Sequence, residues 1–308
     1  MNLKKPKFWD YKKPNIYAFL LFPLTILTSL SNFFNLKKNK IKFKIKTICI
    51  GNIYIGGTGK TSLSIKLNKI LKERNIKTCF IKKQYIDQVD EQKILKKNGE
   101  LFISRKRIDA IKQAENANYK VAIIDDGLQD TKINYDIRIV CFNTINWIGN
   151  GMILPSGPLR ENINNLKKYE HIFLNGNSEE LESHKKFLTN INPNVNIHIG
   201  VYEITNVKEF NLNDKFLIFS GIGNHKTFVE MIKKYGFEVL KDIEFPDHYN
   251  YTDVDLNKIV DEAKKLNCKI ITTEKDYFRL EDKNLSEIKF IKSELKLINE
   301  ENLLKFII

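Results

Sequence analysis

The sequence predicts an α/β fold with two series of alternating strands and helices. Short β-branched or apolar runs, such as residues 121–124, are typical of strands buried on both faces of a parallel sheet. Segments of helical length separate these runs. An irregular stretch near residues 203–214 divides the two series, and one hydrophobic core rarely serves more than roughly 250 to 300 residues. We therefore expect three parts, at residues 1–45, 46–203 and 204–308.

Periodicity places the elements of each series. In the first series we expect strands at residues 47–50, 77–81, 121–124, 137–142 and 172–174, and helices at residues 60–74 and 104–117. In the second, smaller series we expect strands at residues 216–219, 238–243, 269–273 and 289–291, and helices at residues 224–235 and 252–266.

The N-terminal part contains a nearly uncharged stretch, residues 14–36, that is long enough to cross a bilayer. A weak polar stripe that includes Thr25 lies opposite apolar residues such as Phe22 and Ile26. Lysines flank both ends, so no charge asymmetry would orient a spanning helix, whereas a helix lying in the interface places both clusters against headgroups. We expect a membrane-associated, monotopic or shallowly inserted helix. A spanning helix and a buried hairpin remain alternatives, and no small-residue cleavage pattern supports a signal peptide.

Positive charge is concentrated in the same region. The formal net charge is +14, and residues 1–46 contain eleven lysines against one acid, Asp10. Because these lysines surround an apolar stretch, they indicate an anionic membrane surface as partner and no nucleic acid. The alternative, a basic nucleic-acid-binding protein, predicts steeply salt-dependent binding to DNA or RNA. The four scattered cysteines lack zinc spacing and indicate thiols in a reducing compartment.

A glycine-rich loop follows the first expected strand and opens the first expected helix. With the two residues before it, the loop reads Tyr54-Ile55-Gly56-Gly57-Thr58-Gly59-Lys60-Thr61. Its backbone N–H groups can surround phosphate oxygens, Lys60 can reach the β- and γ-phosphates, and the Thr61 hydroxyl can bind magnesium. Tyr54 stands where the strict G-x-x-x-x-G-K-T pattern has its first glycine. The loop predicts ATP and Mg²⁺ as cofactors, and a mostly parallel, P-loop NTPase-like sheet flanked by helices.

Two carboxylates end the apolar strand at residues 121–124. Asp125 and Asp126 follow this strand directly and precede Gly127. A P-loop enzyme holds the acid that completes the magnesium shell at this position. Asp125 is therefore the candidate metal ligand, with Thr61, and Asp126 is a candidate catalytic residue. An Asp-Gly pair is also a common turn, and it is the glycine-rich loop that favours the functional interpretation.

With these motifs the chain resembles the tetraacyldisaccharide 4′-kinases, which phosphorylate the lipid A precursor. The resemblance covers most of the chain. It rests on the nucleotide loop from Gly51-Asn52 onward and on these further motifs: Asp125-Asp126-Gly127-Leu128-Gln129, Gly149-Asn150-Gly151, Leu154-Pro155-Ser156-Gly157-Pro158-Leu159-Arg160-Glu161, Ser220-Gly221-Ile222-Gly223-Asn224, Phe245-Pro246-Asp247-His248 and Thr273-Glu274-Lys275-Asp276. It implies transfer of the ATP γ-phosphate to the 4′-hydroxyl of a lipid-linked disaccharide at the cytoplasmic face of the inner membrane. We expect a monomer.

The resemblance also implies the residues that act on the acceptor. Asp90, paired with His248 of the second domain, would take the proton from the sugar hydroxyl. Arg160 could stabilise the transferring phosphoryl group or hold the acceptor, and a salt bridge with Glu161 or another acid is equally open. The run from Thr273 to Asp276 could face the cleft or cap the next helix. The smaller domain is expected to close over the active site.

The chain departs from the family pattern on the acceptor side. The usual Ser-Arg-Gly-Tyr motif is Lys82-Lys83-Gln84-Tyr85, and Val89 replaces a glycine before Asp90. A rival interpretation is a membrane-associated P-loop ATPase of the dimerising type. Those proteins have a lysine just before the two glycines of the loop, where this chain has Ile55.

Overall fold

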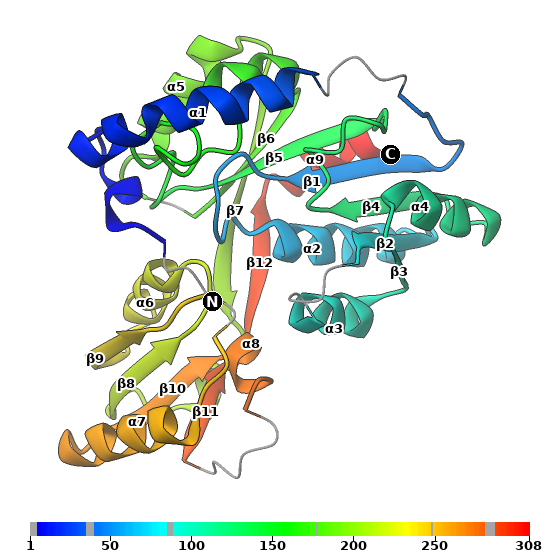
Figure 1. Ribbon diagram of the computed structural model, residues 1–308. Coiled ribbons are helices and arrows are strands. Elements are labelled where there is room, and N and C mark those ends of the chain that lie inside the picture. Colours follow the sequence, from blue (N-terminus) through cyan, green and yellow to red (C-terminus); the bar gives the residue numbers. More distant parts are fainter. Residues whose placement is uncertain (1–4, 35–39, 85–88, 177, 248, 281–286) are drawn as a thin grey trace. The chain divides into compact units, whose positions relative to one another are not determined.

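The computed structural model describes residues 5–34, 40–84, 89–176, 178–247, 249–280 and 287–308 (Figure 1). The chain forms two compact units. The larger unit contains Lys5–Val201 and Leu297–Ile308, and the smaller contains Tyr202–Lys296. This division differs from the expected parts in two ways. The last residues of the chain return to the larger unit, because β12 lies in its sheet, and the described N-terminal segment also belongs there.

An eight-stranded sheet with the order β12-β7-β6-β5-β1-β4-β2-β3 forms the centre of the larger unit. The pairs β1–β4, β1–β5, β2–β4, β2–β3, β5–β6 and β6–β7 are all parallel. The strands are β1 (Lys46–Gly51), β2 (Thr78–Lys83), β3 (Leu101–Ser104), β4 (Val121–Asp125), β5 (Ile137–Asn143), β6 (His171–Asn175), β7 (Asn196–Ile204) and β12 (Ser293–Ile298). The mostly parallel sheet predicted from the sequence is confirmed.

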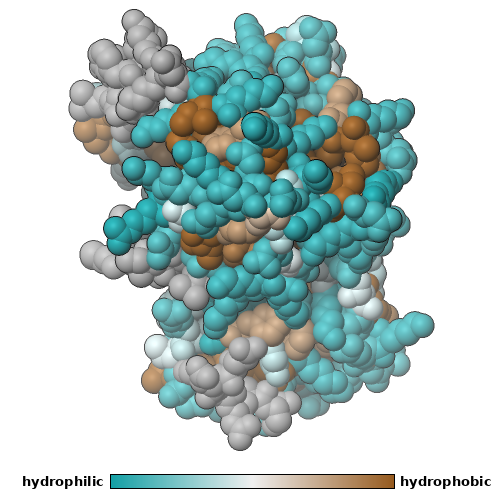
Figure 2. All heavy atoms as spheres, turned by 90° about the vertical axis from the view of Figure 1, so that its right-hand side faces the viewer, coloured by the Kyte–Doolittle hydropathy of each residue, from teal (hydrophilic) through white to brown (hydrophobic). Residues whose placement is uncertain are grey.

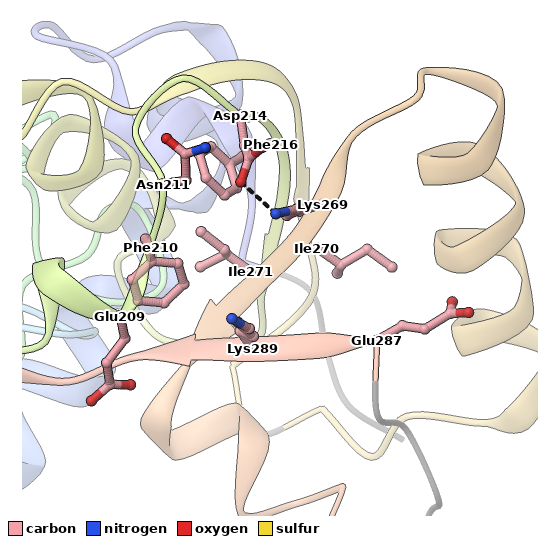
Figure 3. Close-up of a pocket in the computed structure, with 10 residues that line it drawn as sticks. All are labelled: Glu209, Phe210, Asn211, Asp214, Phe216, Lys269, Ile270, Ile271, Glu287 and Lys289. Carbon is pink, nitrogen blue, oxygen red and sulfur yellow. Dashed lines mark ion pairs between the residues drawn. The ribbon is translucent and has the colours of Figure 1, made fainter.

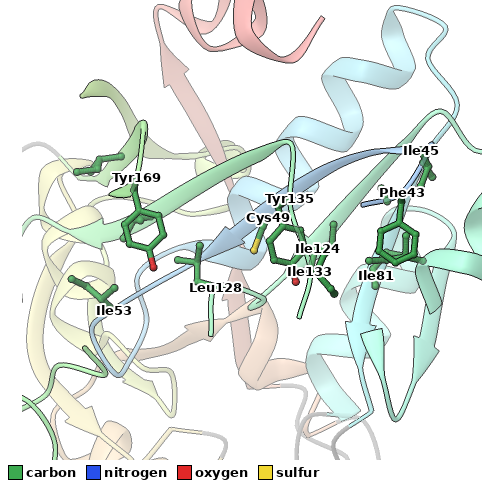
Figure 4. Close-up of a cluster of buried hydrophobic side chains, with 14 of the residues drawn as sticks. Phe43, Ile45, Cys49, Ile53, Ile81, Ile124, Leu128, Ile133, Tyr135 and Tyr169 are labelled. Atoms are coloured by element: carbon green, nitrogen blue, oxygen red, sulfur yellow. The ribbon is translucent and has the colours of Figure 1, made fainter. Parts of the chain in front are cut away.

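Helices cover this sheet, and their apolar faces complete its core. Helix α2 packs on β1, β2 and β4, and α4 packs on β2 and β3. Figure 4 shows one cluster, in which Cys49 of β1, Ile81 of β2 and Ile124 of β4 lie with Leu128 and Tyr135 from the segment after β4. Burying a side chain of this size contributes about 1.5 to 3 kcal/mol. The helices of this unit are η1 (Lys7–Asp10), α1 (Ile16–Phe34), α2 (Lys60–Glu73), α3 (Val89–Asn98), α4 (Arg107–Asn116), η3 (Ile163–Lys168), α5 (Leu181–Ile191) and α9 (Glu300–Ile307).

Helix α1 turns Thr25 toward the protein. The Thr25 hydroxyl is buried, donates to the Ile153 carbonyl at 3.2 Å and lies 2.7 Å from the Ser156 hydroxyl. Phe22 and Ile26, by contrast, are exposed. Among the helices of the described residues, none has the length and apolarity to cross a membrane.

The smaller unit contains a four-stranded parallel sheet with the order β11-β10-β8-β9. This unit contains a cavity of about 200 Å³. Figure 3 shows Phe210, Phe216 and Ile271 among its lining residues, with an ion pair between Lys269 and Asp214. We assign this cavity no part in the chemistry. The elements are η4 (Val207–Glu209), β8 (Lys215–Ser220), α6 (His225–Lys234), β9 (Glu238–Glu244), α7 (Asp253–Lys265), β10 (Lys269–Thr273), α8 (Glu274–Tyr277) and β11 (Ile288–Ile291).

Hydrophilic side chains cover most of the molecular face drawn in Figure 2, with separate apolar patches between them. In the described part of the chain, fifteen large apolar side chains are exposed. Seven of these lie between residues 16 and 26 of α1, which makes this helix the main apolar surface feature of the described residues: Ile16, Tyr17, Phe19, Leu20, Phe22, Leu24 and Ile26.

Candidate active site

The glycine-rich loop connects β1 to α2 as predicted. Gly59 is the N-cap residue of α2 and has φ +86°, a left-handed conformation that glycine adopts without steric cost. A Cβ atom at Gly59 would lie 2.5 Å from Nδ2 of Asn175. The backbone conformation therefore favours glycine here, and any larger residue would also displace the Asn175 side chain.

Buried polar atoms face this loop without a protein partner. Within the described residues, Thr58 Oγ1 and Asn175 Oδ1 are buried and make no hydrogen bond. Leaving such groups unpaired costs about 1 to 3 kcal/mol each, so they indicate a place for a polar ligand. The first N–H groups of α2 also lack helical partners and favour an anion. This arrangement fits the phosphates of a nucleotide.

Thr61 and Asp125 fit a magnesium ion. The Thr61 hydroxyl donates to Asp125 Oδ2 at 3.3 Å, at the junction of α2 and the end of β4. Neighbouring ligands in an octahedral Mg²⁺ shell lie about 3 Å apart, and both groups are the hard oxygen donors that Mg²⁺ prefers. In the described part of the chain, no group of three or more His, Cys, Asp or Glu side chains could hold a metal. Magnesium would therefore depend on these two residues together with phosphate oxygens.

Asp126 is the electrostatic centre of the site. Its Oδ1 lies 3.7 Å from Nζ of Lys60 and accepts a hydrogen bond from Nη1 of Arg160 at 3.0 Å. Burial alone would raise the pKa of Asp126, but the Lys60 ammonium and the Arg160 guanidinium outweigh burial and hold this pKa below its ordinary value. Asp126 is therefore ionised at neutral pH. The salt bridge that the sequence left open for Arg160 is made with Asp126.

Arg160 reaches the loop because two segments far apart in sequence pair with each other. Tyr54 and Leu159 form an antiparallel bridge, and the Arg160 N–H donates to the Ile53 carbonyl at 2.6 Å. Gln129 supports the arrangement from the other side. Its Nε2 donates to the Asn52 carbonyl at 2.9 Å, and its Oε1 accepts from Arg160 at 3.1 Å.

Tyr54 and Ile55 hold the loop in place. The Tyr54 hydroxyl donates to Asp10 Oδ1 at 2.8 Å, and Lys5 also contacts both groups. The Ile55 N–H donates to the Pro158 carbonyl at 2.9 Å. Direct contact of these two residues with a nucleotide stays a prediction.

A basic cavity of about 630 Å³ lies beside Asp126 and Arg160. Positive side chains come from the end of β2, the start of α4 and the segment after β4. The cations in its wall are Lys83, Arg105, Lys106, Arg107, Lys132 and Arg160, with Asp126 and Asp130 as the acids.

Lys82 is a site residue that the sequence reasoning did not assign. Its ammonium is 1% exposed and lies 2.8 Å from Asp125 Oδ2 and 2.5 Å from Glu91 Oε2. Burial alone would lower the pKa of Lys82, but Asp125 and Glu91 outweigh burial and hold this pKa above its ordinary value. The available signal was a lysine directly after the strand expected at residues 77–81, because the structure extends this buried strand to Lys83.

The two residues expected to act on the acceptor hydroxyl are only partly accounted for. The backbone of Asp90 lies in the first turn of α3. Its side chain, and all of His248, lie outside the described residues.

Two motifs of the smaller unit have structural roles. Thr273 caps α8, and the buried Asp276 carboxylate accepts from the Gly221 N–H, the Tyr251 hydroxyl and Arg279. The capping alternative therefore describes this motif. The Ser220 hydroxyl lies 2.7 Å from a ring nitrogen of His225, which also faces Asp242, but Ser220 is fully buried and cannot serve as a nucleophile.

The larger unit has the mostly parallel sheet, and the glycine-rich loop between its first strand and helix, of the P-loop NTPases, a class of proteins that binds nucleotide phosphates. Residues 17–308 match the family model of the tetraacyldisaccharide-1-P 4′-kinases, LpxK. The chain belongs to this family of kinases.

Similar proteins match this chain over nearly its whole length. The tetraacyldisaccharide 4′-kinase of Pelagibacter ubique (strain HTCC1062) is 56% identical over 98% of this chain and 96% of its own. That of Rickettsia canadensis (strain McKiel) is 33% identical over 99% and 96%. A crystal structure of the "apo" form of LpxK from Aquifex aeolicus in complex with ATP matches with a TM-score of 0.68 and 22% identity, covering 95% of this chain and 98% of that chain. This structural match supports the fold.

Proposed function

We propose that this kinase transfers the γ-phosphate of ATP to the 4′-hydroxyl of a tetraacylated glucosamine disaccharide 1-phosphate, which yields lipid IVA in lipid A biosynthesis. One observation carries the proposal: Lys60 and Arg160 converge on Asp126 beside a cavity with a basic wall. Nucleotide phosphates and an anionic acceptor would thus meet at one place. Family membership supports the identity of the acceptor.

On the nucleotide side, the loop amides and Lys60 hold the phosphates. Thr61 and Asp125 hold Mg²⁺, which when bound neutralises the charge that develops during transfer. Arg160 presents a planar guanidinium to the same region, where it stabilises the transferring group. Asp126 keeps both cations oriented between turnovers.

On the acceptor side, the basic cavity binds the phosphorylated sugar. Arg105 and Lys106 directly precede α4, and Lys132 lines the same cavity. Such cations favour a phosphomonoester over a neutral sugar. Asp90, assisted by His248, acts as the general base that takes the proton from the acceptor hydroxyl.

The acceptor is a lipid, and α1 is the surface that meets it. Its exposed apolar side chains enter the membrane interface, while the neighbouring lysines bind anionic headgroups at the cytoplasmic face of the inner membrane. Thr25 joins this helix to the Ser156 turn, in the segment that also carries Arg160. We expect the enzyme to act as a monomer.

The rival function, a dimerising membrane ATPase, predicts ATP turnover without an acceptor. ATP consumption with Mg²⁺ should be measured on anionic vesicles with and without the tetraacyldisaccharide 1-phosphate. We expect consumption to rise at least a hundredfold with the acceptor. Equal consumption on plain vesicles would support the ATPase and contradict the kinase proposal.

A further inference from the structure

Lys82 lies where three elements of the larger unit meet. It is the penultimate residue of β2, and the pairing of Ile81 with Ile124 places it opposite Asp125 at the end of β4. Its second partner, Glu91, lies in the first turn of α3. One ammonium group therefore connects β2, β4 and α3.

The surroundings make this connection specific. The side chains of Lys82 and Asp125 are 1% and 0% exposed, and that of Glu91 is 20% exposed. A buried ammonium persists only where opposite charges compensate for its lost hydration. Two carboxylates gathered around a single point would in turn repel each other without a cation between them. The Lys82 ammonium and the two carboxylates therefore each lower the free-energy cost of burying the other.

Helix α3 packs against α2 and β3. The ion pair between Lys82 and Glu91 ties its first turn to the end of β2. Glu91 adjoins Asp90, so the position of the Glu91 carboxylate sets that of the turn that carries Asp90. A shift of about 1 Å at a reacting group can lower a rate about a hundredfold.

We propose that Lys82 is a positioning residue for phosphate transfer, which joins Asp125 to Glu91 and thereby fixes the first turn of α3 at the carboxyl edge of the sheet. The inference rests on the proposed function, because that function assigns the metal to Asp125 and the base to Asp90. Lys82 acts through these residues and touches neither substrate.

The test compares Lys82→Met, which keeps the volume and removes the charge, with Lys82→Arg, which keeps the charge. Lys77→Met is the matched control, because Lys77 directly precedes β2 and is exposed. We expect Lys82→Met to lower kcat at least thirtyfold and to change KM for ATP less than threefold. The kcat of Lys82→Arg should be at least tenfold higher than that of Lys82→Met, and the kcat of Lys77→Met should match that of the wild type.

Hydrogen exchange supplies a reading that is independent of activity. In protein free of nucleotide and metal, amides of residues 89–98 should exchange at least tenfold faster in Lys82→Met than in the wild type. If Lys82→Met does not fold, Glu91→Gln removes the other end of the bridge and should give the same pattern.

Unchanged exchange in α3, a loss confined to KM, or a kcat within threefold of the wild type would each overturn the inference. If the wild type itself transfers no phosphate to the lipid, the proposed function fails instead, and the exchange comparison still decides the role of Lys82.

Discussion

At the scale of single residues, Asp126 explains how the site keeps its cations ready. Lys60 and Arg160 come from segments about a hundred residues apart, and both face the same carboxylate oxygen. The positive φ of +57° at Asp126 places its side chain toward them after β4 ends. Charge on Asp126 therefore holds both cations at one place in the site.

Replacement of Arg160 by lysine tests whether the guanidinium acts as more than a charge. Lysine would keep the charge but could not contact Asp126 and Gln129 from one planar group, as Arg160 does. We expect kcat to fall about ten- to a hundredfold, equivalent to about 1.4 to 2.7 kcal/mol of transition-state stabilisation. Steady-state kinetics with the lipid acceptor measure this effect.

Arg138→Lys is the control for that substitution, because Arg138 donates only to the Lys168 carbonyl and stacks over Tyr169, among the contacts of the described residues. An equal loss of kcat in both variants would contradict a specific role of the Arg160 guanidinium in phosphate transfer.

At the scale of elements, α1 presents an apolar face to the outside and a polar contact to the protein. Leu20→Glu should weaken binding to anionic vesicles about tenfold, because it removes an apolar side chain worth about 1.5 to 3 kcal/mol on burial. Sedimentation with vesicles measures the bound fraction. Leu20 is 70% exposed, and the control is Val254→Glu in α7, where valine is 61% exposed. Similar binding by both variants would contradict membrane contact through α1.

The neighbouring strands β6 and β7 carry a buried histidine pair. His171 and His198 lie 3.2 Å apart, and burial lowers the pKa of both, that of His198 to about 4. In the unfolded chain these histidines become protonated below about pH 6.5, whereas in the folded chain they stay neutral to a lower pH. The free energy of unfolding should therefore fall as the pH drops from 6.5 to 4, by up to about 3 kcal/mol from His198.

Urea unfolding of the wild type and His198→Gln between pH 7 and 4.5 measures this contribution. Glutamine retains a hydrogen-bonding group and does not titrate, so the free energy of unfolding of His198→Gln should depend less steeply on pH than that of the wild type. Parallel pH profiles for the two proteins would rule out the histidine pair as the cause.

At the scale of the whole molecule, sequence patterns predicted the elements with strong hydrophobic signals. The strand before the loop, the α2 helix and the acidic end of β4 all occur where expected. Patterns missed β3, which has only four residues, and β7, where Ile197 and Ile199 alternate with His198 and Gly200 but the latter two are the buried ones. These strands depend on sheet neighbours that periodicity does not reveal.

The candidate site was predictable to a similar extent. Local spacing identified Lys60, Thr61 and Asp125, because a phosphate loop and a strand end have fixed local geometry. The contacts of Gln129 with Asn52 and of Lys82 with Asp125 arise from pairing between distant segments, which spacing in the sequence cannot specify.

The most direct measurement is the transfer of labelled γ-phosphate from ATP to the tetraacyldisaccharide 1-phosphate, with the product position determined by mass spectrometry. The wild type should give the 4′-phosphate, and Lys60→Ala should reduce the rate at least a thousandfold, because Lys60 neutralises charge on the transferring group. Wild-type activity in Lys60→Ala, or phosphate at another hydroxyl, would contradict the account.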